Sequence, residues 1–587
     1  MIAQVVFDLP LDGPFDYLIP EHLMSKIVVG TRVKVSFGPR SQVGFVIGLL
    51  DQSTIAKLKP IQSLSDTSAV FNDLDLSFAR DFCVYYGCGL GEALATMLRN
   101  KEGLNLSIRR DHEPLISLYR SEPNRYADRI QEIIERYRRH YKDTKGDYCC
   151  FLILVPDSFR AQTLVPQLKA LGAIKIGTRS SVFESDGQYD CVIMVDEEDA
   201  SFKQEQMPMY ETRQVLLTRS KMFGFDIAFV GISPSVELMA LVRGEAQIKL
   251  IENPTVNLPV VRLVDLTNYK FVPGLLSPPV RDALEAALKA GKKSVLILNR
   301  RGSYRMTRCV DCAEILKCSH CDSPLIYSRS EGKFLCRYCT FTAPGDTVCP
   351  QCHKPSWRST GIGVEQLQTE LKKNFPQAKI QSFERAARVV TSAAKQSLNE
   401  FDILISTNAI LRFQGKCLAS VAAFIDFDAE LNRLDMRSAF NAFSLVQHIS
   451  SMATDSVFIQ TRNSNHYVLQ NLSKGNIKGF YDEELKLRKE FGFSPFKHWV
   501  KISWRGKTEK STKEAAQQVY KELSKATPEN FTITPPLADA VGRKRDQFRF
   551  NVMVQTNNVP QAVAFVKSTL QETKRPSRVI LTINIDP

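Results

Sequence analysis

The sequence predicts a multidomain α/β protein with a β-rich N-terminal domain, a cysteine-rich insertion and a small α+β domain at the C-terminus. Three observations predict it. The chain has 587 residues, which corresponds to several domains of ordinary size. Apolar runs of strand length alternate with helical stretches over two long segments, a pattern typical of parallel α/β sheets. Eight of the 14 cysteines lie within one short segment.

The first 104 residues predict the β-rich domain. Short strand-like runs at 28–29, 32–35 and 44–47 are separated by glycine and proline, which favour turns. A small barrel or sandwich fits this pattern, and residues 70–100 then become helical. Residues 105–145 are interpreted as a linker with an amphipathic basic helix. A solvated helix packed by one apolar stripe is favoured there over a dedicated binding helix.

The α/β pattern occupies residues 146–256 and resumes over 257–308 and 353–475. Phe151–Val155, Cys191–Val195 and Ile227–Val230 are apolar runs of the length of buried strands. The cysteine-rich segment, 309–352, interrupts the second α/β region. Residues 476–587 run helix, strand, helix, strand, which predicts the small α+β domain.

Composition indicates a protein that handles nucleic acid. The net charge is +14 and the pI is near 9.1, and lysine and arginine that neutralise phosphates dominate nucleic-acid affinity. A merely basic soluble protein is the alternative. No apolar run has the length of a membrane span, and no charged region precedes an apolar stretch at the N-terminus. We therefore expect a cytoplasmic, nucleoid-associated protein with no membrane partner.

The cysteines form four C-x-x-C pairs. Each such turn directs two thiolates at one point, and two turns complete a tetrahedral tetrathiolate site, so four turns predict two zinc ions. The spacing does not fix which turns share an ion. A disulfide framework is the alternative, disfavoured because the other six cysteines are scattered and no secretory signal precedes them. The pairs are Cys309/Cys312, Cys318/Cys321, Cys336/Cys339 and Cys349/Cys352.

Acidic residues follow one of the buried strands. Asp196, Glu197, Glu198 and Asp199 come directly after Cys191–Val195, at the strand end where α/β folds place ligands. In nucleotide hydrolases such acids hold magnesium and orient water. A solvated strand end produces the same letters, so the tetrapeptide alone is weak evidence.

Several motifs occur in one order that resembles the PriA family of bacterial replication restart proteins. The resemblance covers nearly the whole chain, and the cysteine insertion is its most specific part. The motifs are Phe15-Asp16-Tyr17-Leu18, Gly177-Thr178-Arg179-Ser180, the acids with Phe202-Lys203-Gln204, Gly231-Ile232-Ser233-Pro234-Ser235, Leu298-Asn299-Arg300-Arg301-Gly302, the eight cysteines, and Phe480-Tyr481-x-x-Glu484-Leu485-x-x-Arg488-Lys489.

The resemblance implies a fold and a set of site residues. It implies two RecA-like superfamily 2 helicase lobes, with the zinc insertion in the second. An N-terminal pocket would bind the 3′ end of a nascent strand through Phe15, Asp16, Gly38 and Lys59. In the family the outer cysteine pairs share one zinc and the inner pairs the other. A basic patch of the C-terminal domain would bind branched DNA through Arg543, Lys544, Arg545 and Arg549.

The motor motifs depart from the family. No phosphate loop of the form G-x-x-x-x-G-K-[ST] occurs, and the stretch before Phe151, where we place its counterpart, reads Lys142 to Tyr148 without it. The family's Q-V-A-G-R-A-G-R corresponds to Gln447–Thr454, which has neither arginine. We therefore expect Asp196 and Glu197 to be degenerate remnants, with no ATP or magnesium cofactor. The segment before the first lobe is also too short for the family's winged helix.

The sequence thus favours a non-enzymatic scaffold that binds replication forks, 3′ ends and single strands. Its protein partners would be primosome and helicase-loading proteins and single-stranded DNA-binding protein. The main alternative is an active ATP-dependent 3′→5′ helicase with a divergent nucleotide site. A third possibility is a zinc protein of another nucleic-acid pathway, such as transcription.

Overall fold

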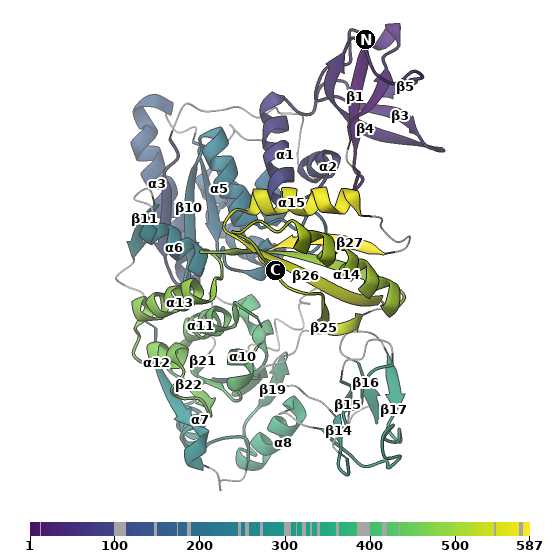
Figure 1. Cartoon of the computed structure of the whole chain (residues 1–587). Helices are drawn as coiled ribbons and strands as arrows, with labels where there is room; N and C mark the ends of the chain where they lie inside the picture. Colours follow the sequence, from purple (N-terminus) through teal and green to yellow (C-terminus); the bar gives the residue numbers. More distant parts are fainter. Residues whose placement is uncertain are drawn as a thin grey trace.

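The computed structural model describes residues 1–11, 13–98, 113–145, 149–172, 174–184, 189–244, 248–252, 258–269, 274–298, 307–312, 314–319, 324–328, 332–336, 341–359, 363–383, 400–413, 419–433, 435–544, 547–573 and 579–587. They form an N-terminal barrel, two α/β lobes, a cysteine-rich module and a C-terminal sheet domain (Figure 1). This arrangement confirms the predicted fold class.

The N-terminal domain is a closed five-stranded barrel. Its strands run in the order β1-β2-β5-β3-β4, and alternate apolar residues such as Val5, Val33 and Val46 fill its interior. Two helices follow, α1 (Asp73–Tyr86) and α2 (Leu90–Leu98). The strands are β1 (Ile2–Phe7), β2 (Phe15–Leu18), β3 (Arg32–Phe37), β4 (Arg40–Leu50) and β5 (Lys59–Leu64).

The first lobe has a six-stranded sheet in the order β11-β6-β10-β9-β7-β8, and all of its strand pairs are parallel. Its strands are β6 (Ile116–Arg120), β7 (Phe151–Leu154), β8 (Ile174–Gly177), β9 (Cys191–Val195), β10 (Asp226–Gly231) and β11 (Ile248–Glu252). Its helices are α3 (Tyr126–Lys145), α4 (Ser158–Leu168), α5 (Thr212–Phe223) and α6 (Val236–Gly244).

The second lobe repeats this plan with the parallel order β12-β22-β21-β13-β20-β19. Its strands are β12 (Val260–Asp265), β13 (Ser294–Ile297), β19 (Ile380–Phe383), β20 (Ile403–Ser406), β21 (Ala419–Phe424) and β22 (Ala453–Thr461). Its helices are α7 (Pro278–Lys289), α8 (Val364–Asn374), α10 (Asp428–Leu431), α11 (Ser438–Ser450), α12 (Tyr467–Ser473) and α13 (Ile477–Phe491).

The cysteine-rich module leaves the second lobe after β13 and returns before α8. Antiparallel pairing of β14 (Thr307–Cys309) with β18 (Trp357–Ser359) closes its base. A three-stranded sheet of β15 (Ile326–Ser328), β16 (Lys333–Leu335) and β17 (Thr342–Pro344) forms the rest. The module therefore extends slightly beyond the predicted 309–352.

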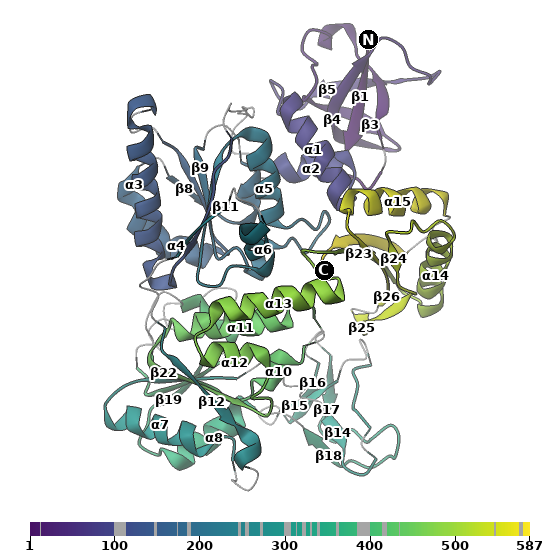
Figure 2. The same ribbon diagram turned by 60° about the vertical axis from the view of Figure 1, so that its left-hand side comes forward.

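The C-terminal domain packs two helices, α14 (Glu509–Lys525) and α15 (Val559–Glu572), on one face of an antiparallel sheet (Figure 2). The sheet order is β24-β26-β23-β27, and β25 also pairs with β26. The strands are β23 (His498–Gly506), β24 (Thr532–Ile533), β25 (Leu537–Lys544), β26 (Gln547–Thr556) and β27 (Ile580–Ile585).

Two predicted boundaries are wrong. The stretch 105–145 was interpreted as a linker, but β6 pairs in parallel with β10 and β11 inside the first sheet. The stripe Ile130, Ile133, Ile134 and Tyr137 of α3 packs into the core of that lobe. Helix α13 was assigned to the C-terminal domain, but its Phe480 and Tyr481 pack into the core of the second lobe. Local periodicity identifies such elements and not the sheet that they join.

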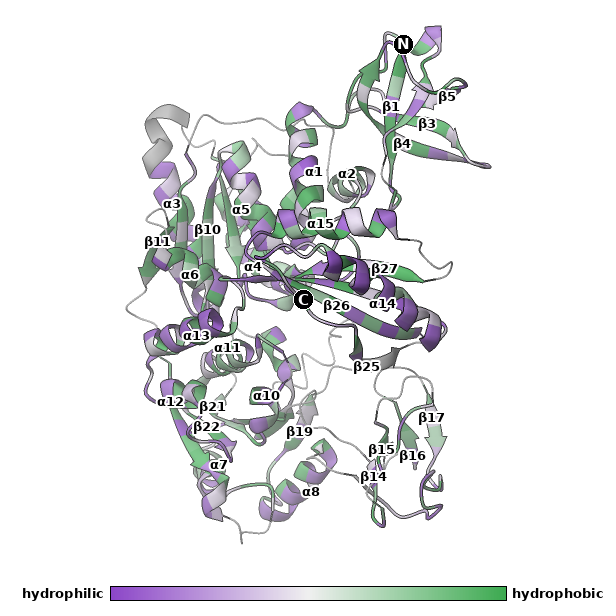
Figure 3. Cartoon of the chain, in the orientation of Figure 1, coloured by the Kyte–Doolittle hydropathy of each residue, from purple (hydrophilic) through white to green (hydrophobic). Residues whose placement is uncertain are grey.

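The described parts share buried cores. Helices α1 and α2, one face of the first lobe and the C-terminal domain contribute to one continuous apolar cluster, so α1 lies beside α15 in both views (Figures 1 and 2). The strands of the two α/β sheets are mainly hydrophobic, whereas α13 and α14 are mainly hydrophilic on the sides that Figure 3 shows. Among the described residues no helix has the length and apolar character needed to cross a membrane.

Candidate nucleic-acid and metal sites

The outer two cysteine pairs come together in the cysteine-rich module. The Sγ atoms of Cys309, Cys312, Cys349 and Cys352 all lie within 4.8 Å of one another. Sγ of Cys309 lies 3.4 Å from that of Cys352, and Sγ of Cys312 lies 3.6 Å from that of Cys349. Thiolates at about 2.3 Å from a tetrahedral ion are about 3.8 Å apart. The four sulfurs could therefore hold a metal ion, and the donor set is the one that zinc prefers.

The inner pairs are only partly visible. Cys318 and Cys336 pack with Leu325 and Phe334 in a small apolar cluster beside the first set. Cys321 and Cys339 lie outside the described residues. The predicted second site is therefore half described, and it stays a prediction.

The predicted 3′-end pocket lies at one end of the N-terminal barrel. Phe15 and Asp16 are adjacent on β2, and the Phe15 ring packs edge-on against Phe37 with ring centroids 5.2 Å apart. Ser53 donates a hydrogen bond from its Oγ to Asp16 Oδ2. The backbone N–H of Ile55 in turn donates to Ser53 Oγ at 3.1 Å. Ser53 was not identified from the sequence, because it lies 37 positions from Asp16.

Two further pocket residues reach the same end through strand pairing. Lys59 begins β5 and is paired with Tyr17, the neighbour of Asp16. Gly38 follows Phe37 in the turn between β3 and β4, with φ +60° and open space where a Cβ would lie. The barrel therefore brings the surroundings of all four predicted residues together.

The predicted C-terminal patch is described in part. Arg549 lies on β26, directly opposite Arg505 of β23. Arg543 and Lys544 belong to β25, where only their backbone is described, and Arg545 lies outside the described residues. The sequence analysis did not identify Arg505 as part of this patch. The available signal was its place at a polar position of a strand in which apolar and polar residues alternate.

The side chains of the first three acids after β9 are buried, and each of their carboxylates has a partner within the protein, whereas Asp199 is exposed. Tyr126 donates to Asp196 Oδ1, and Arg160 Nη1 lies 2.9 Å from Asp196 Oδ2. Glu197 Oε2 lies 2.6 Å from Arg213 Nη1, and its Oε1 accepts from the backbone N–H of Ser235 at 2.6 Å. The third acid, Glu198, contacts the second lobe.

Glu198 and His448 join the two lobes through a buried contact. His448 Nε2, from α11, lies 3.0 Å from Glu198 Oε1, and both side chains are less than a tenth exposed. Burial raises the pKa of Glu198 to about 8, although the hydrogen bond with His448 opposes that rise. Burial lowers the pKa of His448, but the hydrogen bond to Glu198 and the nearby charges of Asp196 and Glu198 together outweigh it, and the net direction is upward. The pair therefore retains a proton at neutral pH.

Asp196, Glu198 and His448 lie close enough together that a cation could be held. Both oxygens of Asp196 are nevertheless engaged, one by a phenol and one by a guanidinium. An arriving metal ion would have to displace Arg160. The local charge is already balanced by the protein, which argues against a magnesium site here.

The phosphate-loop position predicted at 142–148 is wrong. Residues 142–145 end α3 at the amino edge of the sheet, and 146–148 lie outside the described residues. A phosphate loop instead connects the carboxyl end of a parallel strand to the next helix. Beside Asp196 that place belongs to residues 121–125, between β6 and α3. They read Ser-Glu-Pro-Asn-Arg, with neither glycine nor lysine.

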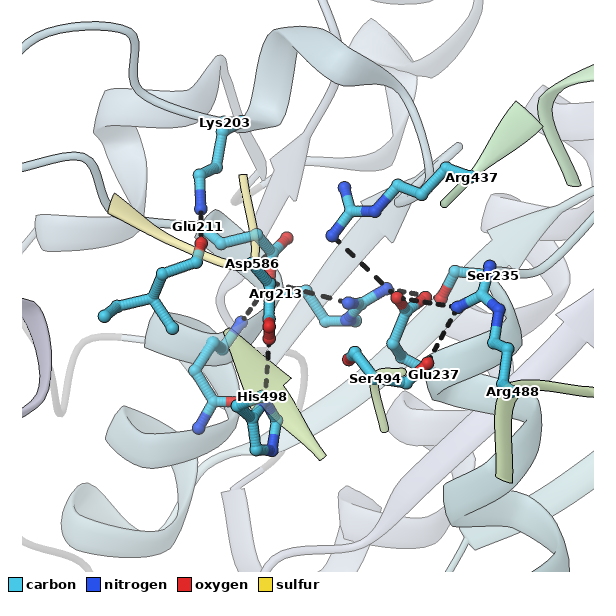
Figure 4. Close-up of polar contacts among 12 residues, drawn as sticks. Lys203, Glu211, Arg213, Ser235, Glu237, Arg437, Arg488, Ser494, His498 and Asp586 are labelled. Atoms are coloured by element: carbon cyan, nitrogen blue, oxygen red, sulfur yellow. Dashed lines mark hydrogen bonds and ion pairs between the residues drawn. The ribbon is translucent and has the colours of Figure 1, made fainter. Parts of the chain in front are cut away.

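A second polar network joins the first lobe, α13 and the C-terminal domain (Figure 4). Arg488 Nη1 lies 3.1 Å from Glu237 Oε1 and donates a hydrogen bond to the carbonyl of Ser494 at 3.0 Å. A guanidinium nitrogen of Arg437 lies 3.8 Å from the same Glu237 oxygen. Burial raises the pKa of Glu237, but Arg437, Arg213 and Arg488 outweigh it and hold the pKa at about 2.

The network continues into the C-terminal strands. Lys203 Nζ donates to the carbonyl of Ile585 at 2.6 Å, and His498 Nδ1 lies 2.7 Å from Asp586 Oδ2 (Figure 4). The Lys203 bond attaches β27 to the first lobe, and the contact of His498 with Asp586 joins the start of β23 to the end of β27. They are ion pairs and hydrogen bonds of buried or half-buried groups, in which solvent screening is weak.

Comparison with known proteins identifies the family. The model of the PriA 3′DNA-binding domain matches residues 4–99, and the model of the primosomal protein N C-terminal domain matches residues 489–587. A replication restart protein PriA of Treponema pallidum is 26% identical over 100% of this chain and 99% of that protein. The chain belongs to the PriA family.

Other PriA proteins match over a shorter length. Those of Borreliella burgdorferi and Bacillus subtilis are each 25% identical over 70% of this chain, which spans 64% and 53% of their lengths. Among solved structures, the DUF1998 helicase MrfA bound to DNA and AMPPNP matches 70% of the chain with a TM-score of 0.35 and 10% identity. No conclusion follows from a structural likeness at that level.

Membership of the PriA family confirms the resemblance and the N-terminal and C-terminal parts that it implied. The 3′DNA-binding model ends at residue 99 and so includes both the barrel and the helices α1 and α2. The C-terminal model begins at 489, at the end of α13. That start agrees with the packing of α13 against the second lobe.

Proposed function

We propose that this chain is a replication restart protein that binds forked DNA and 3′ ends and acts as a scaffold for reloading the replicative helicase, without hydrolysing ATP. The single observation that carries the proposal is the pairing of the acids after β9. Arg160, Arg213 and His448 each neutralise one of the three carboxylates that a nucleotide hydrolase would present to magnesium.

The loop after β6 supports the absence of hydrolysis. A phosphate loop needs glycines, so that backbone amides can surround the phosphates, and a lysine for the β- and γ-phosphates. Residues 121–125 have neither. Ser451, just after α11, and Thr454 of β22 take the place of the family's final arginines, and one such arginine contributes about 10³- to 10⁵-fold in rate.

The test is ATP turnover by the full chain in the presence of a forked DNA. We expect no stimulation above a sample without DNA. DNA-stimulated turnover would refute the scaffold proposal and favour the alternative, an ATP-dependent 3′→5′ helicase with a divergent site. Calorimetry with ATP and magnesium distinguishes a site that binds without hydrolysis from one that does not bind.

The N-terminal barrel would bind the 3′ end. Ser53 holds Asp16 Oδ2, and no described residue donates to Oδ1, so this oxygen would accept a hydrogen bond from a terminal 3′-hydroxyl. Phe15 would stack on the last base, open space at Gly38 would admit the backbone, and Lys59 would meet a phosphate. A 3′-phosphate would meet the Asp16 carboxylate and be rejected.

The cysteine-rich module would hold two zinc ions, one on the outer pairs and one on the inner pairs. Zinc would fix the fold of a module that has only a small apolar core. The module would then present a surface to DNA, to primosome and helicase-loading proteins, or to single-stranded DNA-binding protein. Pull-down of these partners with the intact and the metal-stripped chain tests the proposal, and equal recovery would contradict it.

A further inference from the structure

The C-terminal sheet has one face that its helices do not cover. Val500, Ile502 and Trp504 of β23 point into the core beneath α14 and α15, so the alternate residues Trp499, Lys501, Ser503 and Arg505 belong to the opposite face. Strand pairing places partners from β26 and β27 on that face too: Arg549, Asn551, Met553 and Gln555 from β26, and Ile580, Thr582 and Asn584 from β27. We call this set the open face.

The charge of the open face is one-sided. Strands β23, β26 and β27 contain no aspartate and no glutamate. Their cations on this face are Lys501, Arg505 and Arg549. The acids described nearby belong to other segments: Asp539 of β25 lies 3.9 Å from Lys501, and Asp586 pairs with His498. Within the described part of the chain neither Arg505 nor Arg549 forms an ion pair.

Arg505 and Arg549 are directly opposite each other in the register of β23 and β26. Like charges at such positions are destabilising, because the two Cβ atoms lie about 5 Å apart. The half-buried side chains have Nε atoms that are shielded from solvent, and neither Nε finds an acceptor among the described residues. Buried donors without a partner are rare in folded proteins, and an anion bound beside the pair would supply the missing acceptor.

Two more polar atoms of the open face have no partner within the described part of the chain. They are Nε1 of Trp499, a donor, and Oδ1 of Asn584, an acceptor. Asn584 is opposite Lys501 in the strand register, and Trp499 lies two residues before Lys501 on β23. The face therefore combines anion-binding guanidiniums at one end with uncharged hydrogen-bonding groups and an indole ring toward the other.

We propose that the open face binds single-stranded DNA, with Arg505 and Arg549 sharing a phosphate and the strand running along β23 toward Trp499. This inference rests on the proposed DNA-binding function and adds to it a site apart from the barrel pocket; this site shares only Arg549 with the predicted C-terminal patch. The chemistry favours a nucleic acid because paired guanidiniums bind phosphate bidentately. A single strand is favoured because its exposed bases can contact Trp499 and Asn584. Duplex DNA would present only its phosphates to the flat protein sheet.

The dimensions allow several contacts on one strand. Lys501 is four residues from Arg505, which is about 13 Å along a β-strand, and Trp499 is about 20 Å from it. The arginine pair, the lysine and the indole would therefore meet different nucleotides of the same strand. Ser503, whose Oγ donates to Asn551 Oδ1 at 2.6 Å, lies between them.

The experiment measures binding of the full chain to oligo-dT with a 3′-phosphate, by fluorescence anisotropy over a series of KCl concentrations. The 3′-phosphate excludes the barrel pocket from the signal. The double variant Arg505→Gln/Arg549→Gln should bind about tenfold or more weakly, since two charge-assisted hydrogen bonds are lost. The slope of log K against log[KCl] should fall by about 0.7, because the pair neutralises one phosphate and a single strand releases about 0.7 ion per neutralised phosphate.

The matched control is Lys510→Gln/Lys513→Gln, which removes the same charge from exposed positions of α14, on the covered side of the same sheet. Its affinity and salt slope should stay near those of the wild type. The arginine variant should not unfold at a lower temperature than wild type, because it removes two like charges that lie directly opposite each other. Ultraviolet cross-linking of the wild type should place oligo-dT on peptides from β23 and β26.

Three results would overturn the inference. They are equal affinity of wild type and arginine variant, equal losses in the two double variants, or an equal loss of the arginine variant on blunt duplex DNA. Failure of the wild type to bind oligo-dT would also overturn it. The proposed binding of 3′ ends by the barrel pocket would be tested separately, by whether fork binding depends on the 3′-hydroxyl.

Discussion

Replacing Glu198 with glutamine should stabilise the protein increasingly as pH rises. The carboxylate is buried between the lobes against His448, and its pKa is about 8 instead of about 4.5. A pKa raised by folding contributes stability that is fully present below pH 4.5 and is lost as pH rises through about 8. Glutamine mimics the protonated acid at every pH and so avoids that loss.

The magnitude follows from the shift. Between the unfolded pKa of about 4.5 and pH 7, the unfolded chain releases the Glu198 proton while the native protein keeps it. This interval of about 2.5 pH units destabilises the native state by about 3 kcal/mol, at about 1.4 kcal/mol per unit. Because His448 shares that proton, we expect about 2 kcal/mol. For domains of this size such a change moves the unfolding midpoint by on the order of 5 °C.

The assay is differential scanning calorimetry between pH 5 and 8, following the transition of the two lobes. The midpoint of Glu198→Gln should lie close to that of wild type at pH 5 and above it at pH 8. Glu490→Gln, at an exposed position of α13, is the matched control and should run parallel to wild type. A Glu198→Gln curve that also runs parallel would refute the reasoning that the pair holds a proton.

Three further predictions concern the metal, the DNA end and the lobe contacts. Cys309→Ser should lower the zinc content by one ion per chain, measured by elemental analysis, and an unchanged stoichiometry would show that Cys309 is not a ligand. Asp16→Ala should weaken binding to a fork with a 3′-hydroxyl by about tenfold. Ser53→Ala should weaken it less, because Ser53 only positions Asp16. For either variant, an equal loss of affinity for a 3′-phosphate fork would contradict the pocket. Arg488→Met should cost about 3 kcal/mol or more, since it leaves Glu237 and Glu484 buried without that partner. Lys489→Met, an exposed neighbour, should cost almost nothing, and similar losses in the two variants would show that the buried pairs are not responsible.

The corrections show where sequence reasoning stopped. Hydrophobic periodicity identified several central strands of the lobes, such as β7, β9 and β10, because a buried parallel strand is apolar along its length. It did not assign β6, whose residues Ile116–Arg120 mix apolar and polar side chains, and the phosphate-loop position was therefore sought one strand too late. Helix α13 was placed in the neighbouring domain because an amphipathic helix does not specify which core its apolar stripe meets.

The sequence by itself determined the family, the cysteine pairs and the predominance of parallel α/β structure. Motif order, the C-x-x-C spacing and strand-length apolar runs are properties of the sequence itself. They can be recognised without knowledge of the fold. Only the tertiary structure decided which cations neutralise Asp196, Glu197 and Glu198, and which residues form the open face. Glu198 and His448 are 250 positions apart, and Arg505 meets Arg549 through strand register. Such contacts depend on how whole elements pack, and that is why the partners of the acids after β9 became clear only in three dimensions.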